Sequence, residues 1–173
     1  MEKLEYDKVY SFRELLSLIL LFCPALGFVF VVWFSSQSSS LELTIDFPYF
    51  PVEFSLIAFF GTVATIGGTL DWYYHRKKLG MKISKKERDA EAKALGFGGI
   101  SMFILMWSAT FSDSKHLYLI PIILVLIYTV VMISYDEFVF HQKRCGKLET
   151  IYHRMLVFGN GMAWLSWMYF IYY

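Results

Sequence analysis

The sequence has little charge and few cysteines. Only 18% of its 173 residues are Asp, Glu, Lys or Arg, whereas 57% are apolar and 20% are aromatic. An average soluble domain is about 25% charged and about 45–50% apolar. This composition argues against a nucleic-acid-binding protein, a disordered chain and a secreted disulfide scaffold, and it is typical of a membrane protein.

Five apolar stretches are long enough to cross a bilayer as helices, which takes about 20 residues each. They cover residues 15–34, 54–73, 94–111, 117–135 and 155–173. The first stretch is interpreted as a retained helix, because the region before it is long and mixed in charge, unlike that of a cleaved signal peptide. We therefore predict an all-α integral membrane protein with five transmembrane helices and a single membrane domain over residues 1–173.

Basic residues are segregated along the chain. Fifteen of the sixteen Lys and Arg residues lie before residue 15, between residues 76 and 93, or between residues 136 and 154. Short loops rich in Lys and Arg remain in the cytoplasm, so we expect a cytoplasmic N-terminus and an outer C-terminus. In this topology Cys23 lies within a helix and Cys145 on the cytoplasmic side, too far apart for a structural disulfide.

Two segments of the chain resemble each other. Residues 71–80 (DWYYHRKKLG) align without gaps on residues 137–146 (EFVFHQKRCG), with an acid, a His and a Gly at matching positions. Such a repeat predicts two helical hairpins, residues 51–111 and 117–173, in which helices two to five form an antiparallel four-helix bundle. Residues 1–50, with an N-terminal arm, the first helix and an outer loop, fall outside the repeat. The alternative is the ordinary charged ending that follows many membrane spans.

Acidic and histidine side chains recur at a spacing of four residues at the predicted cytoplasmic ends of these helices. Residues four apart share one face of a helix, and each helix of the repeat carries one such pair. The pairs are Asp71 with His75, Glu87 with Glu91, Glu137 with His141, and Glu149 with His153. Folding each hairpin about its turn would bring the pairs to one end of the bundle. We predict a metal site formed by these eight residues, although any single pair is more often a surface salt bridge.

This ligand pattern resembles that of the ferritin-like di-iron carboxylate proteins. Those proteins use one Glu from each of two helices and Glu-x-x-His from each of the other two, whereas the acid-to-His spacing here is one residue longer. The resemblance implies two metal ions held by carboxylates and imidazoles. Iron is favoured because oxygen-rich ligand sets with some imidazole suit iron or manganese, and zinc remains an alternative.

Three functions are left open by the sequence. The leading prediction is a di-iron membrane oxidoreductase whose lipid or isoprenoid-like substrate reaches a cytoplasmic metal site from the bilayer. The second is a zinc-dependent hydrolase or transferase acting on a lipid headgroup, in which bound hydroxide attacks. The third is a non-enzymatic metal-binding subunit of a larger membrane complex. The expected partners are the bilayer and a lipophilic small molecule, with no nucleic acid, and a homo-oligomer is left open.

Overall fold

A computed structural model describes residues 52–74, 85–142 and 146–173 of the protein, without the side chains of Arg88 and Glu91. Within these ranges the chain forms five α-helices and two π-helical segments and contains no strand, which confirms the predicted all-α class. In the order of the chain, the elements are α2 (Val52–Tyr73), α3 (Lys85–Lys93), η2 (Ala94–Ile100), α4 (Ser101–Thr110), α5 (His116–Asp136), η3 (Glu137–His141) and α7 (Lys147–Tyr172). The predicted first helix, residues 15–34, lies outside the described residues.

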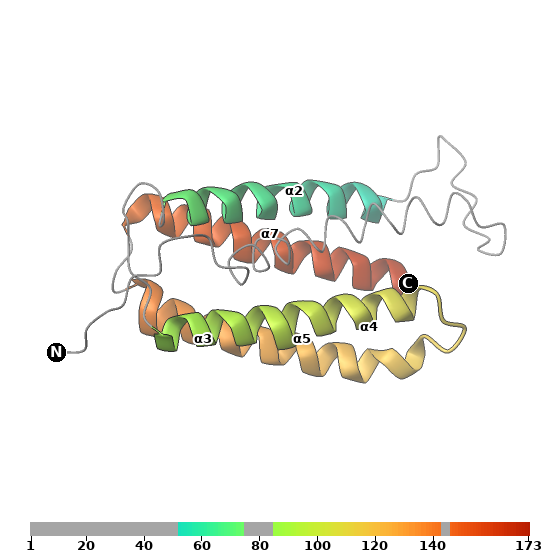
Figure 1. Ribbon diagram of the computed structural model, residues 1–173. Helices are drawn as coiled ribbons and strands as arrows, with labels where there is room; N and C mark the ends of the chain where they lie inside the picture. The colour runs from blue at the N-terminus through green and yellow to red at the C-terminus, as the bar shows by residue number, and fades with distance from the viewer. Residues whose placement is uncertain (1–51, 75–84, 143–145) are drawn as a thin grey trace.

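Four long helical rods make up the described part of the chain. The segments α3, η2 and α4 follow one another without a break, and α5 continues directly into η3. Figure 1 shows that α7 runs antiparallel to α2 and that α5 runs antiparallel to α4. The C-terminal ends of α2 and η3 therefore lie at the same end of the molecule as the first turns of α3 and α7. This arrangement brings the predicted ligand-bearing ends together.

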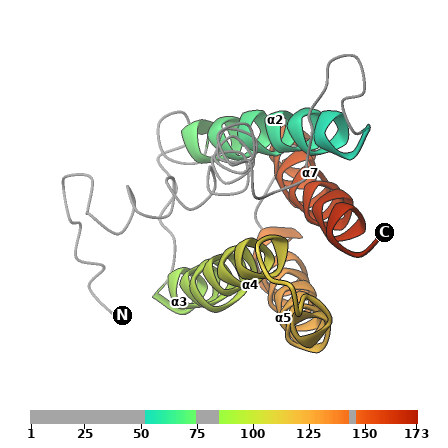
Figure 2. The same cartoon turned by 90° about the vertical axis from the view of Figure 1, so that its right-hand side faces the viewer.

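The closest packing crosses between the two predicted hairpins. The most extensive interface joins α2 to α7, and α5 packs on the rod formed by α3, η2 and α4. A smaller contact between α4 and α7 links the two pairs, and Figure 2 shows α2 and α7 on one side of the molecule and α3, α4 and α5 on the other. The predicted hairpins group the second helix with the third and the fourth with the fifth. The internal repeat and the four-helix bundle built from it remain predictions.

Two glycines explain why α2 pairs with α7. A Cβ atom added to Gly67 of α2 would lie 2.6 Å from the Cβ atom of Met155 and 2.8 Å from the backbone oxygen of Tyr152. A Cβ atom added to Gly159 of α7 would lie 2.6 Å from the backbone nitrogen of Ala64. Such small residues allow helix backbones to approach closely. The two helices are therefore in backbone contact on both sides of their interface.

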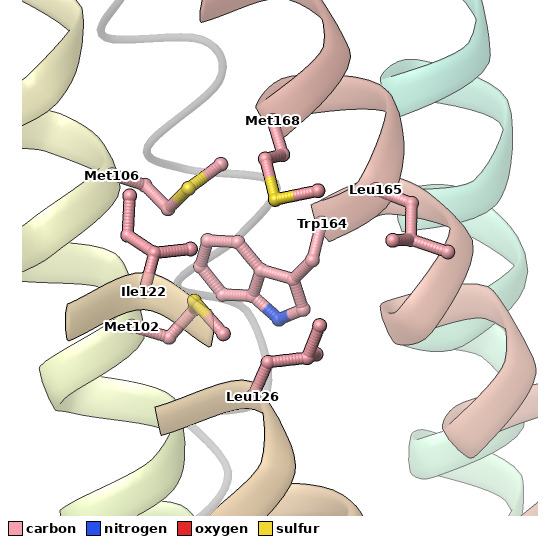
Figure 3. Close-up of a pocket in the computed structure, with 7 residues that line it drawn as sticks. All are labelled: Met102, Met106, Ile122, Leu126, Trp164, Leu165 and Met168. Atoms are coloured by element: carbon pink, nitrogen blue, oxygen red, sulfur yellow. The ribbon is translucent and has the colours of Figure 1, made fainter. Parts of the chain in front are cut away.

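An apolar core lies between α2, α4, α5 and α7. Its fully buried side chains include Phe54, Met106 and Ile122. A cavity of about 10 Å³, room for roughly one water molecule, remains where α4, α5 and α7 meet, and methionines surround the indole of Trp164 there (Figure 3). The residues that line it are Met102, Met106, Ile122, Leu126, Trp164, Leu165 and Met168. Flexible methionine side chains fill irregular gaps, and three of them line this cavity.

Two helices are long and apolar enough to cross a membrane: Val52–Tyr73 and the continuous helix His116–His141. Only 6% of the apolar window in His116–His141 is buried inside the molecule. Its large apolar side chains face outward, for example Ile120, which is 69% exposed, and Leu124, which is 61% exposed. A continuous apolar surface of this kind is rare on a soluble monomer. Contact with lipid and the count of five spans remain predictions.

Candidate metal centre

Three ligand-type side chains from three helices meet at one end of the molecule. Asp71 comes from the last turn of α2, His141 is the last residue of η3, and His153 lies in the second turn of α7. One ligand atom of each lies within 4.8 Å of those of the other two. His141 is buried, while Asp71 and His153 are partly buried. The structure therefore contains a His/His/Asp group that could hold a metal ion.

Local sequence features place Asp71 beside His153. Asp71 follows Gly67 by four residues, so it lies one turn further along the same face of α2. The backbone of α2 touches α7 at Gly67, where the nearest atoms belong to Tyr152, Met155 and Leu156. These residues flank His153 in the chain. The close approach of the two helices at Gly67 thus brings the Asp71 carboxylate within reach of the His153 imidazole.

The start of α7 is fixed by a capping interaction. The backbone N–H of Gly146 donates a hydrogen bond to the carboxylate of Glu149, and the hydroxyl of Thr150 donates to the carbonyl oxygen of Gly146 at 3.1 Å. The bond to Glu149 satisfies a backbone N–H that the start of a helix leaves unpaired. The helix therefore begins at a defined residue, which sets the position of His153 two turns later.

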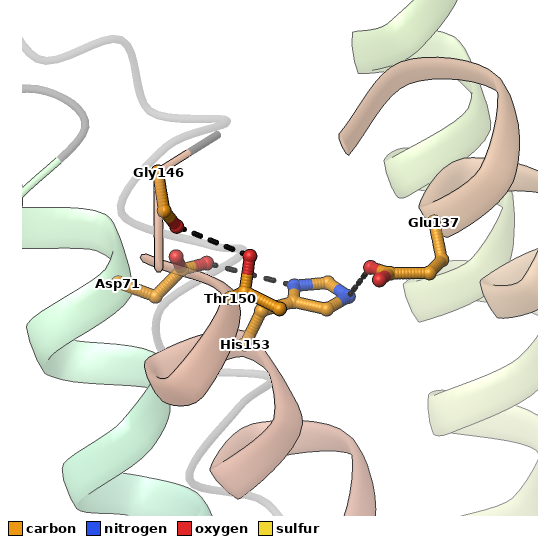
Figure 4. Close-up of polar contacts among 5 residues, drawn as sticks. All are labelled: Asp71, Glu137, Gly146, Thr150 and His153. Atoms are coloured by element: carbon orange, nitrogen blue, oxygen red, sulfur yellow. Dashed lines mark hydrogen bonds and ion pairs between the residues drawn. The ribbon is translucent and has the colours of Figure 1, made fainter. Parts of the chain in front are cut away.

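The imidazole of His153 lies between two carboxylates (Figure 4). Its Nδ1 atom is 3.7 Å from Oδ2 of Asp71, and its Nε2 atom is 3.4 Å from Oε2 of Glu137. The ring of His141 stacks on the ring of His153 with centroids 4.1 Å apart and an interplanar angle of 28°. Two imidazoles and two carboxylates from three rods of the fold are thus in direct contact.

The carboxylates change the protonation of His153, which lies two residues before the predicted span 155–173. Burial lowers the pKa of His153, but the nearby carboxylate of Asp71 and the negative charges of Glu137 and Asp136 together raise this pKa above the ordinary value of 6.5. Without a metal, a proton on His153 therefore offsets part of the negative charge of the site. A metal ion would have to displace this proton, because a metal-bound imidazole nitrogen uses its lone pair.

The geometry fits a metal ion after a small closure. Three atoms separated by 4.8 Å each lie about 2.8 Å from their common centre, compared with about 2.0–2.2 Å for bonds from zinc to imidazole nitrogen or carboxylate oxygen. Side-chain rotations that move each ligand by less than about 1 Å would close this gap. The three side chains would leave other coordination positions free for water or substrate.

Only some of the eight predicted ligands lie together in the structure. It brings Asp71, His141 and His153 together, and it places Glu137 against His153. Among the described residues, this group of three includes neither Glu87 nor Glu149. Glu149 is buried and caps the start of α7. Two further predicted ligands fall outside the description: His75 and the side chain of Glu91.

Two contributors to the site were missed in the sequence. Asp136 adds negative charge near His153, and the signal available for it was a second acid directly before Glu137. The π-helical form of η3, which carries Glu137 and His141, has no comparable signal. Such π-helical turns occur frequently at functional sites, and here the turn directs both of its polar side chains to His153.

No protein-family model, curated protein or solved structure matches this chain. Function must therefore be inferred from the residues of the site and from the surfaces around it. A helical fold by itself does not identify a reaction, because the same architecture hosts many unrelated functions. The His/His/Asp group is the feature of the described residues that carries specific chemistry.

Proposed function

We propose that the protein is a membrane metalloprotein that holds a redox-active metal through Asp71, His141 and His153. The supporting observation is the convergence of their ligand atoms within 4.8 Å from three separate helices. Two histidines and one carboxylate with open coordination positions are typical of non-haem iron(II) oxygenases. Iron is therefore the favoured metal and oxidation the favoured reaction class, with manganese as an alternative metal.

We propose a lipid or isoprenoid-like substrate because of where the site lies. Asp71 and His141 stand at the C-terminal ends of the two helices that are long and apolar enough to cross a membrane. A site at this depth would face the headgroup region of a bilayer, and the basic residues of the neighbouring segments would place that end in the cytoplasm. The exposed apolar surface of α5 would let a lipophilic molecule approach without entering water. Bound iron would supply the activation of dioxygen.

The number of metal ions is a separate question. The described donors suffice for one ion, whereas the di-iron form of the proposal needs further ligands from Glu87, Glu137, Glu149, His75 and Glu91. Bridging carboxylates are the usual means of holding two such ions. A saturating stoichiometry of two equivalents per chain would support the di-iron form, and one equivalent would support a mononuclear centre.

The metal content of the purified protein tests this proposal. We expect the full chain, purified in detergent and reconstituted with iron(II) under anaerobic conditions, to retain one or two equivalents after desalting. The variant His141→Ala should lose iron, because it removes a buried imidazole of the group. His116→Ala is the matched control, since His116 is exposed at the start of α5, away from the site. Failure of the wild type to retain metal, or equal loss in both variants, would contradict the proposal.

A zinc enzyme is the second candidate function. Three protein ligands with an open position also describe catalytic zinc sites, where bound water is the nucleophile. A lipid-headgroup hydrolase or transferase would then be expected, with zinc retained in place of iron. A metal-binding subunit of a larger membrane complex is the non-enzymatic alternative, and the exposed apolar face of α5 is the surface that would contact a partner helix or a second copy.

A further inference from the structure

Glu137 and Asp71 face opposite ends of one imidazole. Asp71 approaches Nδ1 of His153 at 3.7 Å, and Glu137 approaches Nε2 at 3.4 Å. The carboxylates come from different helices and lie on either side of the ring (Figure 4). Asp71 belongs to the group of three converging ligand atoms, whereas Glu137 does not. This difference indicates two distinct roles for the two acids.

Metal binding beside Asp71 determines where the ring proton must lie. A metal that binds Asp71 together with Nδ1 of His153 requires the lone pair of Nδ1, which leaves the proton of the neutral imidazole on Nε2. Histidines that bind metals almost always donate this second N–H to a carboxylate, a carbonyl or a water. Glu137 Oε2 lies 3.4 Å from Nε2, so a shift of about 0.5 Å would form a normal hydrogen bond.

We propose that Glu137 is a positioning residue that accepts the Nε2–H of His153 and directs Nδ1 at the metal, without binding the metal itself. The inference rests on the proposed metal centre and deepens it. It replaces the expectation that Glu137 bridges two ions with a role in orienting one ligand. A glutamate in this role raises the basicity of the ligand and selects one tautomer.

The surroundings of His153 fit this role. The side chains of His153 and Glu137 are 13% and 17% exposed, and a partly buried hydrogen bond to a carboxylate is stronger than one in water. His141 stacks against the same ring at 4.1 Å. The stack restricts the plane of the His153 ring, and Glu137 restricts its rotation within that plane. Since both come from η3, one helical segment orients the imidazole in two directions.

Cobalt(II) binding to the full chain tests the role of Glu137, with d–d absorption as the signal. Glu137→Leu removes the acceptor, so we expect affinity to fall about 10- to 100-fold with unchanged stoichiometry at saturation. Glu137→Gln keeps a carbonyl acceptor and should restore part of the affinity. Glu53→Gln at the opposite end of α2 is the control and should bind as the wild type does. Far-ultraviolet circular dichroism checks that each variant retains its helices.

Each outcome of this titration decides the question. Loss of a whole equivalent of cobalt in both Glu137 variants would make Glu137 a ligand and overturn the proposal. Affinity within twofold of the wild type in Glu137→Leu would also overturn it. Absence of cobalt binding by the wild type would instead overturn the metal centre itself, so the two failures are distinguishable.

Nitrogen NMR of the zinc-loaded protein provides a readout that a merely structural role would not change. Long-range proton–nitrogen spectra of histidine-labelled protein should assign zinc to Nδ1 and the proton to Nε2 of His153. In Glu137→Leu, the chemical shift of the Nε2–H should move because its acceptor is lost. Zinc on Nε2 of His153 in the wild type would contradict the proposed orientation.

Discussion

The two ends of the helical rods satisfy their polar groups in different ways. At the end where α4 turns into α5, Trp167 Nε1 donates a hydrogen bond to Thr110 Oγ1 at 3.0 Å, and Tyr172 donates to the Lys115 carbonyl at 3.0 Å. At the opposite end, the buried atoms Glu137 Oε2 and His153 Nε2 form no hydrogen bond within the described part of the chain and face each other at 3.4 Å. Buried polar atoms are rarely left without hydrogen bonds in native proteins. The first end pairs these polar groups with each other, whereas the second contains a His/His/Asp group that could hold a metal ion.

The two ends also differ in what stabilises them. The packed end is held by apolar burial around Met106, Phe54 and Ile122, each at most 1% exposed. Burying such side chains stabilises the fold by roughly 1.5–3 kcal/mol each. The charged end gathers ionisable groups whose burial is costly unless they are paired or bind a metal. Stability should therefore be lost by changes at the packed end, and metal affinity by changes at the charged end.

The largest expected effect on stability is at the packed end. Met106→Ala removes a fully buried side chain, so we expect the free energy of unfolding of the metal-free protein to fall by about 2–5 kcal/mol. Metal affinity at low temperature, where the variant remains folded, should change less than twofold. Chemical unfolding in detergent and a metal titration on the same sample measure both quantities. A large loss of affinity with little loss of stability would show that the two ends are not separable in this way.

A smaller and more selective effect is expected from the glycine contact between α2 and α7. A methyl group on Gly67 would lie 2.7 Å from the Leu156 nitrogen and 2.8 Å from the Tyr152 oxygen, and these backbone atoms cannot move aside cheaply. Gly67→Ala should therefore separate α2 from α7 and draw Asp71 away from His153. We expect metal affinity to fall about tenfold, which corresponds to about 1.4 kcal/mol.

A matched glycine provides the control for this experiment. Gly161 lies on α7 as well, and an added Cβ atom there meets nothing within 4 Å. Gly161→Ala should leave metal affinity unchanged while raising helix propensity to the same extent. Equal affinities for Gly67→Ala and Gly161→Ala would refute the role of the close backbone contact.

The smallest expected effect is a dependence on pH. The pKa of His153 is raised above 6.5 in the folded, metal-free protein, because the carboxylates of Asp71, Glu137 and Asp136 outweigh the effect of burial. The stabilisation from this protonated form is fully present below pH 6.5 and is lost as pH rises through the raised pKa. Metal affinity should change in the opposite direction and increase with pH over this window.

Calorimetry can separate the proton from the metal. Titrations in buffers with different ionisation enthalpies should reveal proton release on metal binding just above pH 6.5. The variant His153→Gln has no imidazole proton to release at this position and should show a smaller release. Metal affinity that is constant from below pH 6.5 to well above it would contradict competition between proton and metal at His153.

The helices could be predicted from the sequence because their signals are local. The predicted stretches 54–73 and 117–135 correspond to α2, Val52–Tyr73, and α5, His116–Asp136. Length and apolar composition determine such helices without reference to the rest of the chain. The choice of neighbours is different, because it depends on contacts between residues far apart in the sequence. The pairing of α2 with α7 at Gly67 and Gly159 was therefore not predicted.

The candidate site was predictable in part for the same reason. The four-residue spacing placed Glu137 and His141 on one helix face, and in the structure both contact His153; their role as metal ligands stays a prediction. The capping of α7 by Glu149 was not predicted, although glutamate three residues after a helix cap is a local signal. The distances that distinguish a metal ligand from a residue that orients one depend on tertiary packing, and no sequence pattern contains them.

X-ray absorption spectroscopy of the iron(II)-reconstituted full chain tests the proposed metal centre most directly. The iron edge spectrum should contain the multiple-scattering signal of two imidazole rings, together with oxygen scatterers from a carboxylate and water. His141→Ala should remove iron or reduce the signal to one imidazole. Bound iron surrounded only by oxygen atoms, or an imidazole signal unchanged by His141→Ala, would contradict the assignment of Asp71, His141 and His153 as the metal ligands.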